Sequence, residues 1–386
     1  MSESPITNDD DLDREQPARP LQSSSRRRPP TLSRRRKWIY RLVALFLSLL
    51  LTLTLVEFGL RIITPGSDAN LFVYQRSSIR NKVMRPNVRA VVYGVPFETN
   101  ENGFRARRAY TTEKEPDIKR IVAIGDSFTA CAGVAFEAIF TTRLEKELQA
   151  ACPEFRLEVY NLAVGGHQIL HHVATMREVA SGYDPNLVLL FLYPSNDFNA
   201  HTYHDEREFI EQHADGDDQL TLPPLDRGLV RSLYITRAWG SQVQYAMRRI
   251  GVFDRMLGPS NYERLLQSFE RRTPNWKENA DALADFAQLS RESGVSCIVY
   301  LLPTNYGTYE MQEPLYRLAE EACRDAGLTV VSLLGRFAES GSAPTDFQIN
   351  LIDGHPNAEY GALVSKFVFD DLKQRGQVAA LREQIP

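Results

Sequence analysis

The feature that most constrains the fold is a short apolar run at residues 121–124, which ends at Gly125-Asp126-Ser127. Four consecutive apolar residues bounded by a glycine are typical of a strand buried on both faces. Such a strand presents the next side chains at the carboxyl edge of its sheet, where open α/β sheets place their chemistry. The alternative interpretation is an ordinary strand-to-helix turn, in which Asp126 or Ser127 only caps the following helix.

From residue 119 onward the sequence alternates between strand-like and helix-like segments. Several of the strand-like segments are continuously apolar, as expected when helices cover both faces of a parallel sheet. The pattern therefore predicts an α/β domain with a parallel five-stranded sheet. The predicted strands are 119–124, 157–161, 186–192, 295–302 and 328–333, and the predicted helices lie near 137–150, 168–181, 275–293, 310–326 and 356–374.

Residues 198–274 interrupt this alternation. The segment is rich in His, Asp, Glu and Arg, and we expect it to be an insertion that forms a partly helical cap beside the site. His201, His204 and His213 could suggest a metal site, but they lack a familiar ligand spacing. A solvated polar surface is the preferred interpretation, and the sequence predicts neither a metal nor a cofactor. His171 and His172 lie just past the glycine turn and could contact substrate, but capping or surface roles are the preferred interpretation.

The N-terminal 63 residues fall into two segments. Residues 1–37 are rich in Ser, Pro, Arg and Asp, which predicts a disordered basic tail. Residues 38–63 are mostly apolar and predict one transmembrane helix. A cleaved signal peptide or a buried core helix are the alternatives.

Charge predicts the orientation of this helix. Seven basic residues lie in 26–37, whereas only Arg61 lies near the other end. The positive-inside rule then places the N-terminus in the cytoplasm. We therefore expect an uncleaved, single-pass signal anchor in the cell inner membrane and a periplasmic or otherwise extracytoplasmic domain.

Composition adds two limits. With 386 residues, of which 43% are hydrophobic, the chain can bury a substantial core, and a net charge of −4 gives no general case for a nucleic-acid partner. The four cysteines fit no metal-binding spacing, and their disulfide pairing stays open, although a buried free thiol is expected for Cys297. The other three are Cys131, Cys152 and Cys323.

Three more polar segments follow predicted strands or open the last helix: 161–166, 193–197 and 353–357. Acyl transfer to a serine needs a base for the hydroxyl proton and donors for the developing oxyanion. His355 can act as base and then as acid near neutral pH. Asp353, two residues earlier, can hold the His355 tautomer. The donors would be the backbone N–H of Ser127, an N–H of the Gly165-Gly166 turn and the amide of Asn196.

Together with Gly125-Asp126-Ser127, these segments resemble the four blocks of the SGNH (GDSL-type) hydrolases over roughly residues 100–375. The resemblance implies a three-layer, flavodoxin-like domain. It implies that Ser127 is the nucleophile, that His355 is the base oriented by Asp353, and that Ser127, Gly166 and Asn196 form the oxyanion hole. Asn102-Gly103-Phe104-Arg105 is also similar to members of this superfamily that carry an N-terminal membrane segment.

Three positions depart from the family pattern. The spacing Asp-x-His at residues 353–355 is one residue shorter than the frequent Asp-x-x-His. Ser195 replaces a glycine of the third block, and Ala163 replaces the first glycine of the second block.

The expected organisation is a tail (1–37), a membrane anchor (38–63), a lead-in region (64–118) with short strands at 88–92 and 95–97, and a hydrolase-like domain (119–386). The expected activity is that of an exported serine esterase or acyl hydrolase, with an O-acetylated glycan as a reasonable substrate. One alternative is an O-acetyltransferase that uses the same site with a membrane acyl-donor partner. The other is an inactive glycan-binding module.

Overall fold

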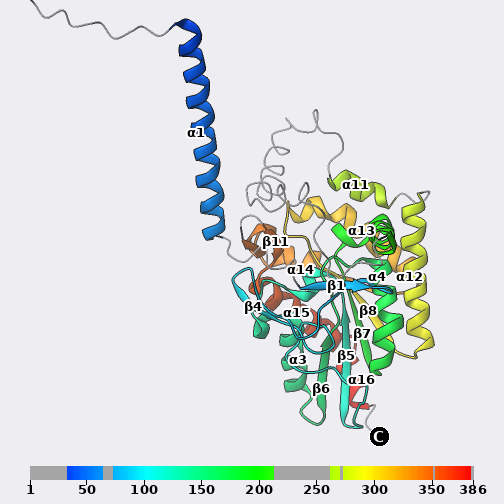
Figure 1. Cartoon of the computed structure of the whole chain (residues 1–386). Coiled ribbons are helices and arrows are strands. Elements are labelled where there is room, and N and C mark those ends of the chain that lie inside the picture. Colours follow the sequence, from blue (N-terminus) through cyan, green and yellow to red (C-terminus); the bar gives the residue numbers. More distant parts are fainter. Residues whose placement is uncertain (1–32, 64–72, 213–260, 270–272, 351–352, 384–386) are drawn as a thin grey trace, which may run out of the picture. The chain divides into compact units, whose positions relative to one another are not determined.

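The computed structural model describes residues 33–63, 73–212, 261–269, 273–350 and 353–383 (Figure 1). Most of the predicted disordered tail therefore lies outside the described residues, as does the centre of the insertion at 198–274. The chain divides into two units, residues 1–52 and 53–386.

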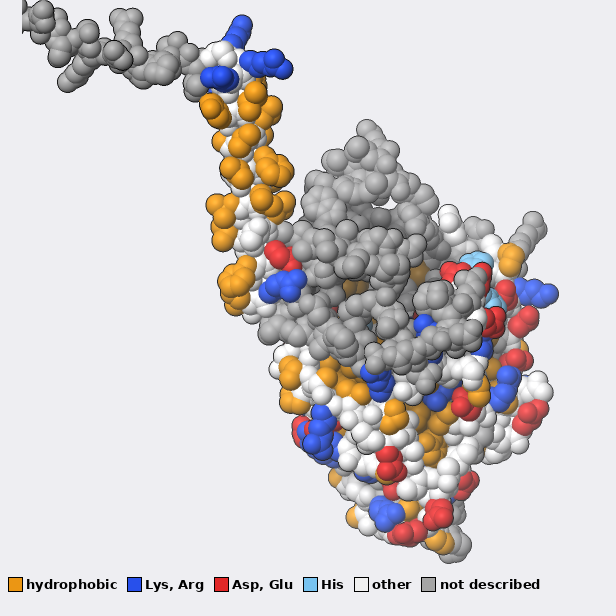
Figure 2. Space-filling model, viewed as in Figure 1, with side chains coloured by type: hydrophobic (Ala, Val, Ile, Leu, Met, Phe, Trp, Pro, Cys, Tyr) orange, Lys and Arg blue, Asp and Glu red, His pale blue; other side chains and the backbone are white. Residues whose placement is uncertain are grey.

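Helix α1 (Arg34–Ile63) contains the predicted apolar segment and begins four residues before it. Its 30 residues correspond to about 45 Å at 1.5 Å per residue, more than the hydrocarbon core of a bilayer. Hydrophobic side chains surround the helix, with several Lys and Arg side chains at its N-terminal end and Arg61 paired with Glu57 near the other end (Figure 2). By length and composition this helix can cross a membrane.

A five-stranded parallel sheet forms the centre of the second unit, in the order β6-β5-β7-β8-β9. This confirms the α/β fold with a five-stranded parallel sheet. The first strand lies between the second and the third, so the strand order reverses between β5 and β7, and ligands bind at such switch points. The strands are β5 (Ile118–Ile124), β6 (Arg156–Asn161), β7 (Leu187–Leu192), β8 (Ser296–Leu301) and β9 (Thr329–Ser332).

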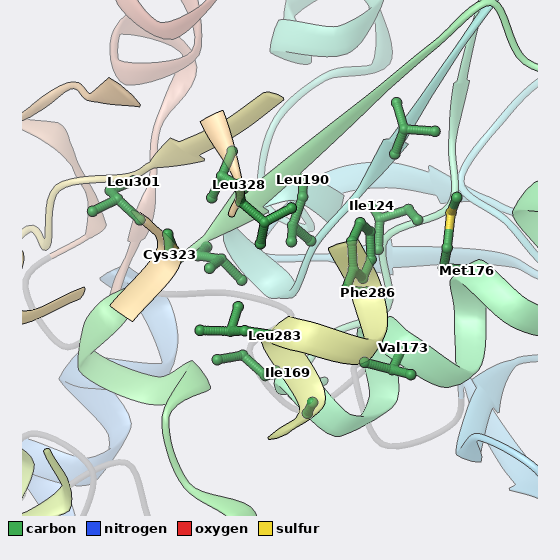
Figure 3. Packing of buried hydrophobic residues seen from close by; sticks show 14 of the residues in the cluster. Ile124, Ile169, Val173, Met176, Leu190, Leu283, Phe286, Leu301, Cys323 and Leu328 are labelled. Carbon is green, nitrogen blue, oxygen red and sulfur yellow. The ribbon is translucent and has the colours of Figure 1, made fainter. Parts of the chain in front are cut away.

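Helices cover both faces of this sheet because side chains alternate between the faces along each strand. Val122 and Ile124 of β5 belong to one buried cluster, part of which Figure 3 shows, and Ile121 and Ala123 belong to the other. The first cluster involves α4 (Ile169–Thr175), α12 (Pro274–Glu292) and α13 (Tyr309–Asp325), and the second involves α3 (Phe140–Ala151), α14 (Leu334–Glu339), α15 (Ala358–Gln374) and α16 (Gln377–Glu383).

Shorter helices follow several strands or belong to the insertion. The predicted helix at 168–181 is α4 followed by a π-helical segment (Met176–Ala180) and a 3₁₀ turn (Ser181–Tyr183). The other helical segments are α2 (Ser127–Ala130), α5 (Pro194–Asp197), α6 (Ala200–Gln212), α11 (Asn261–Ser268) and the 3₁₀ turns Phe136–Ala138 and Pro344–Phe347.

Three small antiparallel hairpins lie outside the main sheet. Strands β3 (Arg89–Val92) and β4 (Val95–Glu98) agree with the two short strands expected in the lead-in region. The other two hairpins were not predicted; they are β1 (Tyr74–Ser77) with β2 (Asn81–Met84), and β10 (Gln348–Asn350) with β11 (Asp353–Pro356). The four cysteines are all free.

Candidate active site

The serine turn follows β5 directly. Asp126 is the N-cap of α2 and its Oδ1 accepts a hydrogen bond from the Phe128 N–H at 2.8 Å. A Cβ at Gly125 would overlap the Thr129 side chain, so only glycine fits here. Of the two residues that could cap the following helix, Asp126 is therefore the one that does so, and Ser127 is the first residue of that helix. Ser127 is partly exposed, and its hydroxyl forms no hydrogen bond with any described residue.

Two polar side chains fix the position of α2. The buried Arg105 donates to the carbonyls of Ala130, at 2.9 Å, and of Cys131. A cation at a helix C-terminus stabilises the unpaired carbonyls there. Asn161, at the end of β6, donates from Nδ2 to the Thr129 carbonyl at 3.0 Å. Arg105 belongs to the Asn-Gly-Phe-Arg segment, so the structure gives that segment a role in holding the serine turn.

The Asp-x-His spacing is explained by strand β11. Side chains two residues apart on a strand project from the same face. Asp353 and His355 therefore lie together, with 2.5 Å between Asp353 Oδ1 and His355 Nδ1, and the His355 N–H also donates to Oδ1 at 2.9 Å. The shorter spacing consequently brings the two side chains into contact.

Burial and pairing act in opposite directions on this Asp–His pair. Burial lowers the pKa of His355, but the hydrogen bond and charge of Asp353, with a further contribution from Asp126, raise it above its usual value overall. Burial raises the pKa of Asp353, yet the His355 contact and the Tyr93 hydroxyl hold it well below its usual value. Asp353 is therefore ionised at neutral pH. Because Nδ1 of His355 faces Asp353, Nε2 is the nitrogen left for proton transfer.

Ser127 and the Asp353–His355 pair lie at the same edge of the sheet. Helix α2 packs against β11, and the ring of Phe128 lies 5.9 Å from the ring of His355. No hydrogen bond joins Ser127 Oγ to His355 in the described part of the chain. Catalytic hydrogen bonds are often long without substrate and shorten in the reacting complex.

The predicted oxyanion donors meet beside Ser127. The φ of Gly166 is +75°, a left-handed value that favours glycine. A Cβ at the neighbouring Gly165 would lie 3.5 Å from Ser127 Cβ, so this turn faces the serine. The amide of Asn196, in α5 after β7, donates to the His167 carbonyl at 3.5 Å, which places it at the same turn. The glycine turn is therefore a neighbour of both Ser127 and Asn196, as the predicted oxyanion hole requires.

Replacing Asn196 by alanine is expected to lower kcat on an ester by about 10²–10³-fold, because one oxyanion donor is lost. Steady-state kinetics with a neutral short-chain ester measure this. His204→Ala, at a more than half exposed side chain on α6, is the control and should stay within about twofold. A loss below tenfold for Asn196→Ala would contradict its assignment to the oxyanion hole.

Several residues at the site were not identified as site residues from the sequence. Tyr93, in the two-residue turn of the β3–β4 hairpin, donates its hydroxyl to Asp353 Oδ2 at 2.7 Å. Both Tyr93 and Gly94 have positive φ, as the favoured hairpin turns require. The Tyr-Gly pair between two β-like runs was the available signal for the turn, but not for its contact with Asp353.

The loop after β8 supports β11. Asn305 donates from Nδ2 to the Gly354 carbonyl at 3.1 Å and to the Phe347 carbonyl at 3.2 Å. A Cβ at Gly354 would overlap the Tyr306 ring, so the residue between the Asp and the His must be small. These contacts fix the strand that carries the Asp–His pair.

A charged pair lies at the glycine turn. Lys82 of β2 forms an ion pair with Glu206 of α6 at 2.9 Å, and the other oxygen of Glu206 lies 3.2 Å from His171 Nε2. A Cβ at Gly166 would lie 2.7 Å from Lys82 Nζ. Lys82 of the lead-in region and Glu206 of helix α6 therefore both lie beside the glycine turn.

Beneath the serine turn lies a buried group of three titratable side chains, Asp126, His172 and Asp197. His172 Nε2 is 3.6 Å from Asp197 Oδ2. Burial, followed by the charge of Asp197, raises the pKa of Asp126 to about 7, and burial lowers the pKa of His172 to about 4. The surface role expected for His172 is therefore wrong. His171 is also buried, but its Nδ1 accepts from the Gln168 N–H, so its capping role is confirmed.

The histidines of the insertion are only partly described. His204 pairs with Glu278 on α12, and His213 lies outside the described residues. Among the residues that the structure describes, no group of three His, Cys, Asp or Glu side chains is arranged to hold a metal ion.

The sequence matches no protein-family model and no curated protein. Among solved structures it is similar to the acetylxylan esterase Axe2 from Geobacillus stearothermophilus, with 14% identity over 66% of this chain and 94% of that one, and a TM-score of 0.39. It is also similar to TesA, with 15% identity over 66% and 99% of the two chains and a TM-score of 0.38. An α/β hydrolase from the Lake Arreo metagenome, LAE5, has 14% identity over 69% and 96% of the two chains and a TM-score of 0.36.

Fold and site together define a class. The chain is a three-layer α/β protein with the strand order of the flavodoxin-like folds, and a serine, an Asp–His pair and an asparagine meet at its switch point. This is the arrangement that the resemblance to the SGNH (GDSL-type) hydrolases implies.

Proposed function

We propose that the protein is a serine-dependent ester hydrolase. The observation that carries the proposal is the Asp353–His355 pair on one face of β11, at the same sheet edge as the partly exposed Ser127. A nucleophile, a base and a group that orients the base are the three parts that acyl transfer through serine requires.

The geometry supports a two-step reaction. His355 Nε2 takes the Ser127 hydroxyl proton while Oγ attacks the ester carbonyl. The N–H groups of Ser127 and Gly166 and the Asn196 amide stabilise the oxyanion, and His355 then protonates the leaving alcohol. Water, activated by the same histidine, releases the acyl group and restores Ser127.

We further propose that α1 anchors this activity to the cell inner membrane, with its basic N-terminus in the cytoplasm. Support comes from the length of the helix, its apolar surface and the four basic residues of its first turn, Arg34–Lys37. An O-acetylated glycan of the cell envelope is the proposed substrate, and a membrane acyl-donor partner is expected only if the acyl group passes to a glycan rather than to water.

The test uses the full chain in detergent, p-nitrophenyl acetate and a fluorophosphonate probe, with Ser127→Ala as the matched variant. We expect turnover and covalent labelling of the native protein, and neither in the variant. Labelling without hydrolysis, together with acetyl transfer from p-nitrophenyl acetate to an added glycan in a separate unlabelled sample, would favour the transferase. If the native protein shows neither labelling nor turnover, the serine mechanism is refuted and a glycan-binding module remains.

A further inference from the structure

The three proposed oxyanion donors belong to three elements: α2, the glycine turn before α4, and α5. Each of these elements contributes one side chain to the buried group beneath the serine turn. Asp126 directly precedes Ser127, His172 lies on α4, and Asp197 directly follows Asn196. All three side chains of the group are at most 1% exposed. The group therefore lies where the supports of the proposed oxyanion hole meet.

Asp197 holds the amide of Asn196. Its Oδ1 accepts a hydrogen bond from Asn196 Nδ2 at 3.3 Å, and its Oδ2 accepts from the Tyr193 N–H at 2.7 Å, which fixes the carboxyl group to the start of α5. Asn196 Nδ2 carries two protons. It also lies 3.5 Å from the His167 carbonyl, a distance at which a hydrogen bond is weak. One N–H of the amide is thus fixed by Asp197, and the other is available to an oxyanion.

Asp197 can hold the amide in this way only as an acceptor. Both of its oxygens accept N–H bonds, an arrangement that suits the ionised form. Burial raises the pKa of Asp197 well above its usual value, and the bonds from Tyr193 and Asn196 oppose this rise. Any further N–H that faces the carboxyl group therefore helps to keep it an acceptor.

His172 supplies such an N–H. Its Nε2 lies 3.6 Å from Asp197 Oδ2, which is longer than a hydrogen bond but close enough for electrostatic attraction in a buried site. Burial lowers the pKa of His172 to about 4, so the ring is neutral and carries one N–H, which the nearby carboxylate favours on Nε2.

The burial of His172 is not explained by packing. Its ring nitrogens form no hydrogen bond with any described residue, and burying such a polar group costs free energy. An apolar side chain like that of the neighbouring Val173, which packs in the hydrophobic core on the same helix, would avoid this cost. The contact with Asp197 gives the imidazole a function that an apolar side chain could not supply.

We propose that Asp197 and His172 are positioning residues for the oxyanion hole: Asp197 holds the Asn196 amide, and His172 keeps Asp197 in its accepting form. Both act through Asn196 rather than on the reacting atoms. The inference rests on the proposed ester hydrolase function and adds residues that set its rate.

The test is a double-mutant cycle on the full chain with p-nitrophenyl acetate. His172→Leu removes the N–H but keeps a side chain of similar size, and we expect it to lower kcat at least about tenfold, a part of the about 10²–10³-fold that one oxyanion donor contributes. KM should stay within about twofold, because the positioned amide acts in the transition state. In the Asn196→Ala background the same substitution should change kcat by less than about twofold, because the group that it positions is gone.

Two further variants separate positioning from a merely structural role. His172→Gln restores an N–H near the place of Nε2 and should keep kcat within about threefold of native. Val173→Ala truncates the next buried residue of α4, so it should lower the thermal unfolding temperature but leave kcat within about twofold. The extent of fluorophosphonate labelling counts the active sites in each sample, so that kcat refers to folded protein only.

The outcomes are distinct. An equal loss of kcat from His172→Leu in the native and Asn196→Ala backgrounds, or no loss in either, would overturn the inference and leave the hydrolase intact. Absence of labelling and turnover in the native protein itself would instead refute the proposed function. If His172→Leu does not fold, Asp197→Asn takes its place in the cycle with the same expected results, because an amide has only one accepting oxygen for the two N–H bonds.

Discussion

Replacing His355 by alanine is expected to lower kcat for ester hydrolysis by about 10⁶-fold, a loss comparable to that of removing the nucleophile. The proposed site has one base for both proton transfers, and Asp353 cannot replace it because its low pKa keeps it a poor base at neutral pH. Steady-state kinetics on p-nitrophenyl acetate, with covalent labelling of Ser127 as a second readout, measure the effect.

The matched control is His204→Ala. This histidine lies on α6, where it is more than half exposed and pairs with Glu278 rather than with the site. Its removal should change kcat by less than about twofold, as for most surface substitutions. If His204→Ala matched the loss of His355→Ala, or if His355→Ala kept more than one per cent of native activity, the assignment of His355 as the base would be wrong.

Replacing Asp353 by asparagine is expected to lower kcat by about 10⁴-fold, because an amide stabilises the wrong tautomer of the base. Tyr93→Phe removes only the second hydrogen bond to the Asp353 carboxylate, so it should cost less than about tenfold. A larger effect of Tyr93→Phe than of Asp353→Asn would show that the hairpin, rather than the carboxylate, sets the geometry.

The Asp353→Asn variant should also change the pH dependence of kcat/KM. In the proposed mechanism the neutral form of His355 is the active base, so activity should rise with pH as His355 loses its proton. Asp353 raises the pKa of His355, which places the acidic limb of the native kcat/KM profile above the ordinary histidine value of about 6.5. Asp353→Asn removes this stabilisation of the imidazolium, and the limb should move to lower pH. A limb that stays in place would show that Asp353 does not act on the base.

Much of the fold could be predicted because it depends on local patterns. The continuously apolar strands 187–192 and 297–302 indicated a parallel sheet, and the glycine after residue 124 indicated where the first strand ends. The structure confirms these elements within a few residues. Ser127, His355 and Asn196 could be proposed as site residues because each follows a predicted strand or precedes a predicted helix, and because their segments resemble the four SGNH blocks.

The features that could not be predicted from the sequence depend on contacts between segments that are distant in the chain. The Asp-x-His spacing looked short for a loop, but it suits a strand, and β11 exists only because β10 pairs with it. Lys82 and Tyr93 occur in short hairpins before the sheet, and no local pattern says that these hairpins reach the site. His172 carries no signal of burial in the sequence, because its burial depends on the packing of Asp126 and Asp197.

The hydrogen bond between Tyr93 and Asp353 joins residues 260 positions apart. A ribosome adds about 5–20 residues per second, and domains generally fold as their chains emerge, N-terminal parts first. The sheet can begin to assemble while the last strand and helix are still being made, but the acid–base pair becomes complete only after residue 355 has left the ribosome. In the proposed site, the Asp–His pair therefore forms later than the strand that carries Ser127, however early the sheet assembles.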